Sequence, residues 1–269
     1  MSQVLTLITS DAALLRCELD RVRAGFAFEP GSIVGVGCWQ DGQVVQRRYG
    51  LGANAGEAWD ASDSEVALLA SRALSVGQGL EESAQPFRFR QWLFAAAGTL
   101  ERGDQVRERL REELPEFLAA AVRGPTWEEA AFARFLAELR EIGRIEDASL
   151  DSATAAARLA SCAKAIEQVS GGAGVKTRPG FALVASNGRM VVATRRGGEN
   201  LSYALLEGQA QCAIHDLAPN ASDAEPLVRD HRRRRSVVVA SGVHPGDGWV
   251  SLPDGSTLAI DRKLSVTLR

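Results

Sequence analysis

A short apolar run in the first half of the chain decides the fold: Trp92-Leu93-Phe94-Ala95-Ala96-Ala97-Gly98-Thr99-Leu100, or WLFAAAGTL. Residues 92–97 are all apolar and the run has the length of a strand, so it predicts a strand that is covered on both faces. The run ends in three alanines and Gly98, where we expect the chain to turn. Other parts of the chain must therefore pack on both faces of this strand.

Segments on either side predict antiparallel strands joined by tight turns. Asn187-Gly188 separates FALVAS from RMVVATR, and Asp41-Gly42 separates SIVGVGCW from VVQRRYG. Both dipeptides supply the positive φ angles that short hairpin turns require. Further strand-like runs are found at residues 3–9, 65–74, 236–241, 248–252 and 257–262.

Helical patterns provide the expected cover. Ser10 or Asp11 can cap a helix over residues 10–23, and Thr126 with Glu129 predicts a capping box at the start of another helix. Gly171-Gly172 is typical of a helix end. The remaining helical patterns cover residues 103–114, 125–143 and 150–172. Strands, then helices, then strands predict an α+β sandwich of sheets faced by helices, which we expect to be a single domain over residues 1–269.

Composition limits the classes of function. The chain has 269 residues, 45% of them hydrophobic, which is enough for a full core. Its 31 Lys and Arg residues against 34 Asp and Glu residues give a net charge of −3. This balance argues against a protein whose overall charge attracts nucleic acid or membranes. The first residues lack a basic region before their short apolar run, and no stretch reaches about 18 apolar residues. We therefore expect a cytoplasmic protein with neither a signal peptide nor a membrane span.

The cysteines and histidines show no recognised metal-ligand spacing. No two cysteines form a CxxC pair, and every histidine lies in the last quarter of the chain. The sequence predicts free buried thiols, no metal site, no cofactor, and no base near Cys17 that would make it a thiolate. The residues concerned are Cys17, Cys38, Cys162, Cys212, His215, His231 and His244.

A basic run in the C-terminal third of the chain is a candidate binding site. Arg232, Arg233, Arg234 and Arg235 follow His231, and arginine side chains grip phosphates and carboxylates bidentately. Acidic residues at 223, 225 and 230 flank the run. They favour a solvated loop over a surface for nucleic acid or for an acidic partner.

The order and spacing of these segments resemble class II glutamine amidotransferases, in particular the small stand-alone proteins of that family, over nearly the whole chain. The resemblance implies an N-terminal nucleophile hydrolase fold, which is a four-layer αββα sandwich of two mainly antiparallel sheets. The resemblance rests on the segments LTLITSDAALL, GVGCWQDG, SRALSVG, QPFRFRQWLFAAAGTL, RGPTWEEAAFARFL, FALVASNGRMVVATR and the tail from VVVAS to GWVSLPDGSTLAID.

The resemblance also implies where the nucleophile and the oxyanion hole would lie. In that family an N-terminal cysteine, exposed when Met1 is removed, attacks the side-chain amide of glutamine with its own α-amino group as the base. Position 2 of this chain is Ser2. The oxyanion strand of the family usually reads His-Asn-Gly, and Ala96-Ala97-Gly98 stands at that place. Gly98 can persist for its backbone angles alone.

Two further positions of the family hold the substrate. The arginine on the glutamine carboxylate matches Arg72, although the histidine two residues before it is Ala70. Arg72 is equally compatible with a structural salt bridge. The aspartate on the ammonium group matches Trp127, whose bulk we expect to fill the pocket or make it apolar, while Glu129 serves as the helix cap.

These substitutions lead to three hypotheses. The first is a catalytically inactive amidotransferase-like protein that binds an unknown protein partner or small ligand, with Arg72, Ala97, Gly98 and Trp127 as the remnant of the ligand site. The second is an amidohydrolase of altered specificity with Ser2 as its nucleophile, which requires the removal of Met1. The third uses the arginine run from Arg232 to Arg235 to bind nucleic acid or an acidic partner.

Overall fold

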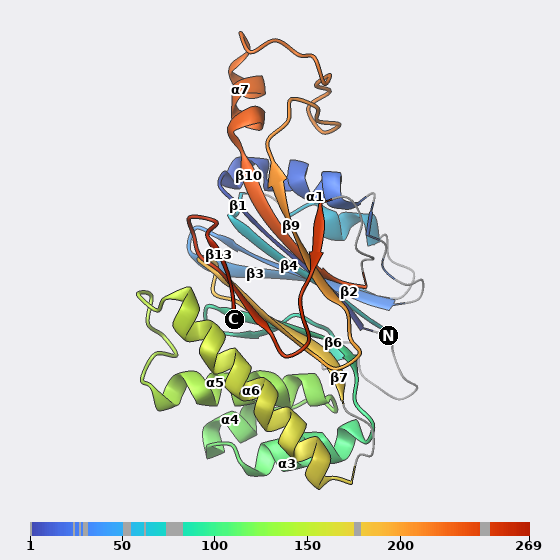
Figure 1. The fold of residues 1–269 in the computed structure, drawn as a ribbon, viewed down its shortest axis with the longest axis vertical. Helices are drawn as coiled ribbons and strands as arrows, with labels where there is room; N and C mark the ends of the chain where they lie inside the picture. Colours follow the sequence, from blue (N-terminus) through green and yellow to red (C-terminus); the bar gives the residue numbers. More distant parts are fainter. Residues whose placement is uncertain are drawn as a thin grey trace.

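Two antiparallel sheets lie face to face, with helices on the outer face of each (Figure 1). The structure is a computed structural model and describes residues 2–23, 25–26, 28, 32–50, 55–61, 63–73, 83–174, 179–242 and 248–269. Met1 and His244 lie outside these residues.

The first sheet has seven strands and carries the N-terminal residues at its centre. β1 pairs with β10 on one side and with β4 on the other, and every pairing in this sheet is antiparallel. The order is β11 (Trp249–Ser251), β9 (Leu201–Glu207), β10 (Arg235–Ser241), β1 (Ser2–Thr9), β4 (Val66–Ala73), β2 (Ser32–Gln40) and β3 (Gln43–Tyr49).

The second sheet has six strands and contains the apolar run that predicts the fold. That run is β6, which pairs with β7 from Leu93 to Thr99. The order is β13 (Val266–Leu268), β12 (Thr257–Ile260), β8 (Val191–Arg196), β7 (Gly180–Ser186), β6 (Trp92–Thr99) and β5 (Phe87–Phe89).

Helices complete the outer layers. The first sheet is covered by α1 (Leu15–Arg23), which η1 (Ala12–Leu14) precedes, and by η2 (Ala55–Trp59). The second is covered by α3 (Gly103–Glu112), α4 (Glu116–Ala121), α5 (Trp127–Glu141) and α6 (Ser152–Gly172). No helix within the described ranges is both long and apolar enough to cross a membrane.

Three buried clusters lie between the four layers. On β6, Phe94 and Ala96 belong to the cluster under the helices, whereas Leu93, Ala95 and Ala97 belong to the cluster between the sheets. A third cluster joins the first sheet to α1 and η2. This alternation confirms the prediction of a strand covered on both faces, and the layers form the predicted αββα sandwich.

Local details follow the sequence with some corrections. Asp41 and Gly42 both have positive φ angles between β2 and β3, as a tight hairpin turn requires, and Asp11 caps the first helical segment. α6 continues through Gly171-Gly172, and the left-handed residue is Gly174. β9, β13 and α4 were not expected, because β13 and α4 are short and β9 mixes polar and apolar residues.

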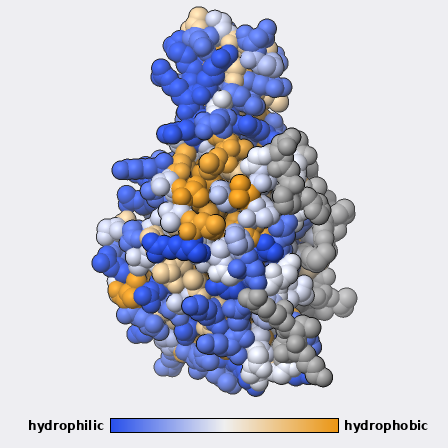
Figure 2. Space-filling view, in the orientation of Figure 1, coloured by the Kyte–Doolittle hydropathy of each residue, from blue (hydrophilic) through white to orange (hydrophobic). Residues whose placement is uncertain are grey.

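The connection between β9 and β10, residues 208–234, projects from the body of the sandwich (Figure 1). It contains α7 (Pro226–Arg233), which begins with a proline at its first turn, where the missing N–H costs nothing. Its surface is mainly hydrophilic, whereas apolar surface gathers on the body just below it, over β9 to β11 (Figure 2). Leu205 of β9 and Val250 of β11 are exposed in that region. We call residues 208–234 the 208–234 connection.

Candidate functional site

The positions that match the family's site lie together at one end of the sandwich. Ser2 is directly opposite Arg72 in the pairing of β1 with β4. Trp127 packs on Phe181, which pairs with Gly98 at the end of β6. α5 carries both Trp127 and Glu128, which pairs with Arg72. The first turn of α5 therefore joins the two sheets at this end.

Arg72 forms an ion pair with Glu128. Its guanidinium Nη1 lies 2.9 Å from Glu128 Oε2, and the side chains are 15% and 2% exposed. Burial raises the pKa of the Glu128 carboxyl, and the Arg72 charge acts in the opposite direction. The alternative of a salt bridge for Arg72 is thus the arrangement present here, with a partner that the sequence comparison did not single out.

Trp127 does not face Arg72. Its indole packs edge-to-face on Phe181 at 5.8 Å between ring centroids, and it belongs to the cluster between the second sheet and the helices. The match of Trp127 to the ammonium ligand stays a prediction of the resemblance; in the structure Trp127 packs in the core, and its neighbour Glu128 reaches Arg72. Successive residues of a helix point about 100° apart, which accounts for the difference.

The helix cap below these residues also differs in part from the prediction. Thr126 Oγ1 accepts a hydrogen bond from Glu129 N, as expected of a cap. The Glu129 carboxylate, however, accepts from the backbone N–H groups of Arg123 and Gly124. Glu129 thereby holds the chain that enters α5 and stays away from Arg72.

The strand that matches the oxyanion site presents apolar groups and backbone that is already bonded. Both backbone groups of Ala96 are bonded by one side chain: Gln85 Oε1 accepts from Ala96 N at 2.6 Å, and Gln85 Nε2 donates to Ala96 O at 3.1 Å. The methyl group of Ala97 is fully buried between the sheets. Gly98 has a φ of +100°, and a Cβ there would lie 2.4 Å from Gly180 O. Packing against β7 is thus enough to require glycine at this position.

Ser2 begins β1 and is 9% exposed. Val4 and Ile8, at even-numbered positions of the same strand, lie in the core between the sheets, so Ser2 is on the face that looks toward β6. Its α-amino group would be free only if Met1 were removed, and Met1 lies outside the described residues.

A cavity of about 700 Å³ lies at the other end of the sandwich. Trp92, the first residue of β6, lines it, whereas Gly98 is near the opposite end of that strand. Arg90, Asp147 and Arg262 line it as well, so its wall carries charges of both signs. This cavity is separate from the end that holds Ser2 and Arg72.

The arginine run does not form one exposed basic surface. Arg232 is exposed and pairs with Asp223 at 3.0 Å, and Arg233 and Arg235 are exposed as well. Arg234, by contrast, is 3% exposed, and its Nη2 lies 2.5 Å from the buried Glu18 carboxylate of α1. Arg234 therefore holds the 208–234 connection to α1. Its buried side chain is not on the surface, which corrects the prediction that it belongs to a partner-binding surface.

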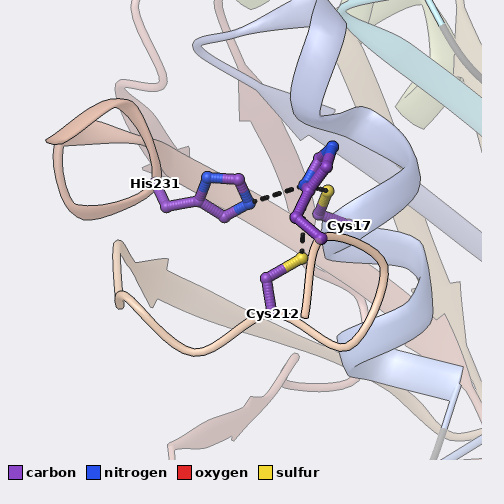
Figure 3. A group of neighbouring side chains, drawn as sticks. Cys17, Cys212 and His231 are labelled. Atoms are coloured by element: carbon purple, nitrogen blue, oxygen red, sulfur yellow. Dashed lines mark hydrogen bonds between the residues drawn. The ribbon is translucent and has the colours of Figure 1, made fainter. Parts of the chain in front are cut away.

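The 208–234 connection also brings together side chains that the sequence spacing kept apart. Cys17, Cys212, His215 and His231 each offer one ligand atom, and these atoms all lie within 4.8 Å of one another. Figure 3 shows Cys17, Cys212 and His231 converging from three separate segments. The thiols are free and buried, as predicted, but the expectation of no base near Cys17 is wrong, because His215 Nδ1 lies 3.4 Å from its Sγ.

Part of this cluster was visible in the sequence. Cys212 and His215 form a C-x2-H pair, a spacing that suits two ligands on one tight turn. In the structure Cys212 and Leu217 exchange both backbone hydrogen bonds across that turn, and Asp216 adopts a positive φ of 52° within it. Cys17 could not have been assigned in this way, since it lies 198 residues from His215 along the chain.

Comparison with known proteins agrees with the fold. No protein-family model and no curated protein sequence matches the chain. Among solved structures it is similar to a glutamine aminotransferase class-II domain protein from Silicibacter pomeroyi, with a TM-score of 0.61 at 16% identity, covering 100% of this chain and 98% of the other. A predicted glutamine amidotransferase from Pseudomonas aeruginosa gives a TM-score of 0.57 at 15% identity, covering 100% and 96%.

A larger enzyme extends the likeness. The glutamine phosphoribosylpyrophosphate amidotransferase of B. subtilis gives a TM-score of 0.54 at 10% identity, covering 99% of this chain and 48% of that one. The chain thus corresponds to about half of that enzyme and to almost the full length of the two smaller proteins. The order of layers, the antiparallel sheets and these similarities lead to one conclusion: the chain has the N-terminal nucleophile hydrolase fold of class II glutamine amidotransferases.

Proposed function

We propose that the chain is a catalytically inactive amidotransferase-like protein that binds a partner protein or a small ligand. The observation that carries this proposal is the ion pair of Arg72 with Glu128. In the family that the sequence resembles, the matching arginine holds the carboxylate of glutamine. Here a carboxylate of the chain itself takes that place, so an incoming glutamine would have to displace a buried acid.

The strand that matches the oxyanion site supports the same proposal. Stabilising a tetrahedral intermediate requires hydrogen-bond donors aimed at the developing charge, and the loss of one such donor lowers the rate by about 10²–10³. The buried methyl group of Ala97 offers none. Ala96 N is already bonded to Gln85.

A serine hydrolase is the second candidate. Ser2 lies opposite Arg72, and Glu128 places an acid beside that arginine. Arg72 and Glu128 are therefore opposite charges that an amino acid could bridge with its carboxylate and ammonium groups. This candidate requires a free α-amino group on Ser2, whereas the proposed binding function does not.

Glutamine turnover separates the two candidates. The purified full chain is incubated with L-glutamine and glutamine analogues, release of ammonia and glutamate is followed, and intact mass reports whether Met1 is retained. We expect no release above that of a Ser2→Ala variant. Release that disappears in Ser2→Ala would refute the proposal.

Substitution of Glu128 tests directly whether its ion pair with Arg72 keeps a ligand from binding. Glu128→Gln keeps the size of the side chain and removes the charge that neutralises Arg72. We expect binding of L-glutamate or L-glutamine, measured by calorimetry, to be stronger in this variant than in the wild type. Asp223→Asn is the matched control, because its partner Arg232 is exposed and lies in α7 of the projecting connection, whereas Arg72 lies in β4. Tighter binding by the wild type would show that Glu128 serves the ligand rather than replaces it.

A further inference from the structure

We propose that Cys17, Cys212, His215 and His231 bind one zinc ion, which fastens the 208–234 connection to α1. The four ligands come from α1, from the turn at residues 212–217 and from α7. The site lies at the base of the projecting connection and is independent of Ser2, Arg72 and the proposed function.

The three distances from His215 Nδ1 to the other ligand atoms are those of a tetrahedral site, and all four atoms lie within 4.8 Å of one another. With bonds of about 2.3 Å to sulfur and 2.0–2.1 Å to nitrogen, a tetrahedral zinc ion holds nitrogen and sulfur about 3.5 Å apart and two nitrogens about 3.3 Å apart. His215 Nδ1 lies 3.4 Å from Cys17 Sγ and 3.6 Å from Cys212 Sγ. It lies 3.2 Å from His231 Nε2. All three distances match within a few tenths of an ångström.

The hydrogen bonds around His231 orient it as a ligand. Its Nδ1 lies 2.8 Å from the carbonyl oxygen of Leu227, which can only accept, so Nδ1 carries the proton. Nε2 therefore presents its lone pair to the centre of the cluster. A ligating histidine that donates its other N–H to a backbone carbonyl is the usual arrangement at metal sites.

Hydrogen bonding alone does not account for the cluster. His215 Nδ1 is near two thiols and the Nε2 atom of His231, yet one ring nitrogen can donate a single hydrogen or offer a single lone pair. A cation at the centre would accept a lone pair from all four atoms at once. One ion thus explains all three contacts of His215 Nδ1 together, whereas a single hydrogen or lone pair on that nitrogen serves one of them.

Charge and burial are compatible with zinc. Two thiolates neutralise the ion, so the loaded site adds no net charge to a place where Cys17, Cys212 and His231 are buried. Glu18 and Arg234, whose charges act on Cys17, form an ion pair of their own, and Glu18 also pairs with Arg21 at 3.7 Å. His215 is exposed, which gives the ion a path from solvent.

The set of donors and their spacing select the metal and its role. Two sulfurs and two nitrogens in a tetrahedron are typical of zinc. A two-iron cluster divides such ligands between two metals, which would separate the thiolates from the imidazoles more than is seen here. Because the chain supplies all four ligands, no position is left for a substrate, and the site is structural.

Metal analysis of the intact protein tests the proposal. The full chain is purified under reducing conditions without chelator, its metals are measured by mass spectrometry, and the apoprotein is titrated with Co²⁺, whose visible absorption reports tetrahedral thiolate ligation. We expect one zinc per chain and a saturable absorption at one equivalent of Co²⁺.

Variants assign the ligands. His215→Ala removes the exposed ligand and is therefore the variant least disturbing to the fold, and Cys212→Ser removes a thiolate. Both are expected to lose the stoichiometric zinc and the cobalt spectrum. Cys38→Ser, which alters a buried thiol of β2 outside the cluster, is expected to keep both. Wild-type protein without zinc or cobalt absorption, or a Cys17–Cys212 disulfide found in its place, would overturn the proposal.

Discussion

At the scale of single residues, the pairing of Arg72 with Glu128 has an energetic consequence. Removing one partner of a buried ion pair leaves an uncompensated charge and costs about 3–5 kcal/mol. Glu128 is 2% exposed, so Arg72→Met should lower the free energy of unfolding by about that amount. Chemical denaturation followed by circular dichroism measures the change.

The double variant serves as the control for this prediction. Arg72→Met combined with Glu128→Leu removes both charges, and we expect most of the lost stability to return, since apolar replacements of buried pairs are often neutral. Equal losses in the single and double variants would mean that the packing of the Arg72 stem, rather than its charge, stabilises this end of the sandwich.

The residues of this site could be predicted from the sequence only in part. Ser2, Arg72, Ala97 and Gly98 lie at one end of the sandwich, as the order of segments implied. Glu128 was missed because the family's pattern points to Trp127, and a shift of one residue on a helix turns the side chain by about 100°. Which of two neighbours faces Arg72 depends on how α5 packs, and no local pattern in the sequence carries that information.

At the scale of elements, Gly98 shows why β6 ends as it does. Its φ is +100°, and an added Cβ would lie 2.4 Å from Gly180 O and 2.8 Å from Phe181 Cα. Overpacking a core typically costs 1–3 kcal/mol, and a positive φ adds about 1–2 kcal/mol for a residue with a Cβ. Gly98→Ala should therefore destabilise the protein by at least about 2 kcal/mol in thermal or chemical unfolding.

Gly171→Ala is the matched control. Gly171 lies in the last turn of α6, where a Cβ would meet nothing within 4 Å. Alanine is favoured over glycine in a helix by about 0.5–1 kcal/mol, so this variant should be slightly more stable than the wild type. If both variants had the same stability, packing against β7 would not explain the glycine, and a role in binding would regain support.

Elements with a clear period or a strong turn signal were the ones that the sequence predicted. β6, the hairpin at Asp41-Gly42 and α5 have such signals, and they are where the patterns place them. The second hairpin forms as well, but residues 187–190 join its strands and only Gly188 among them has a positive φ, so its turn is longer than the Asn187-Gly188 dipeptide predicts. The 208–234 connection has neither signal, so the sequence indicated only a loop with a basic run. Its contacts with α1, through Arg234 and the cysteine and histidine cluster, join segments that are distant along the chain, and such contacts leave no trace in local periodicity.

At the scale of the whole molecule, the sandwich and the 208–234 connection should respond differently to loss of the ion. The sandwich is held by three buried clusters that include none of the four ligands. Cys17 and Cys212 lie in a small separate cluster with Leu14. The connection, by contrast, has few buried apolar side chains: Ala210, Cys212 and Val228. Regions with little apolar burial open at a lower free energy than the core does.

A chelator should therefore loosen the connection and leave the sandwich folded. We expect hydrogen exchange measured by mass spectrometry to rise within residues 208–234 and in α1 after zinc is removed, while β6, β7 and α5 keep their protection. Added zinc should restore it, since a ligand that binds only the closed form stabilises that form by RT ln(1 + [L]/Kd). His215→Ala should show the exchange of the chelated wild type whether or not zinc is present. If exchange rose equally throughout the chain, the ion would be stabilising the whole fold, and if it rose nowhere, the Glu18–Arg234 pair alone would be enough to hold the connection in place.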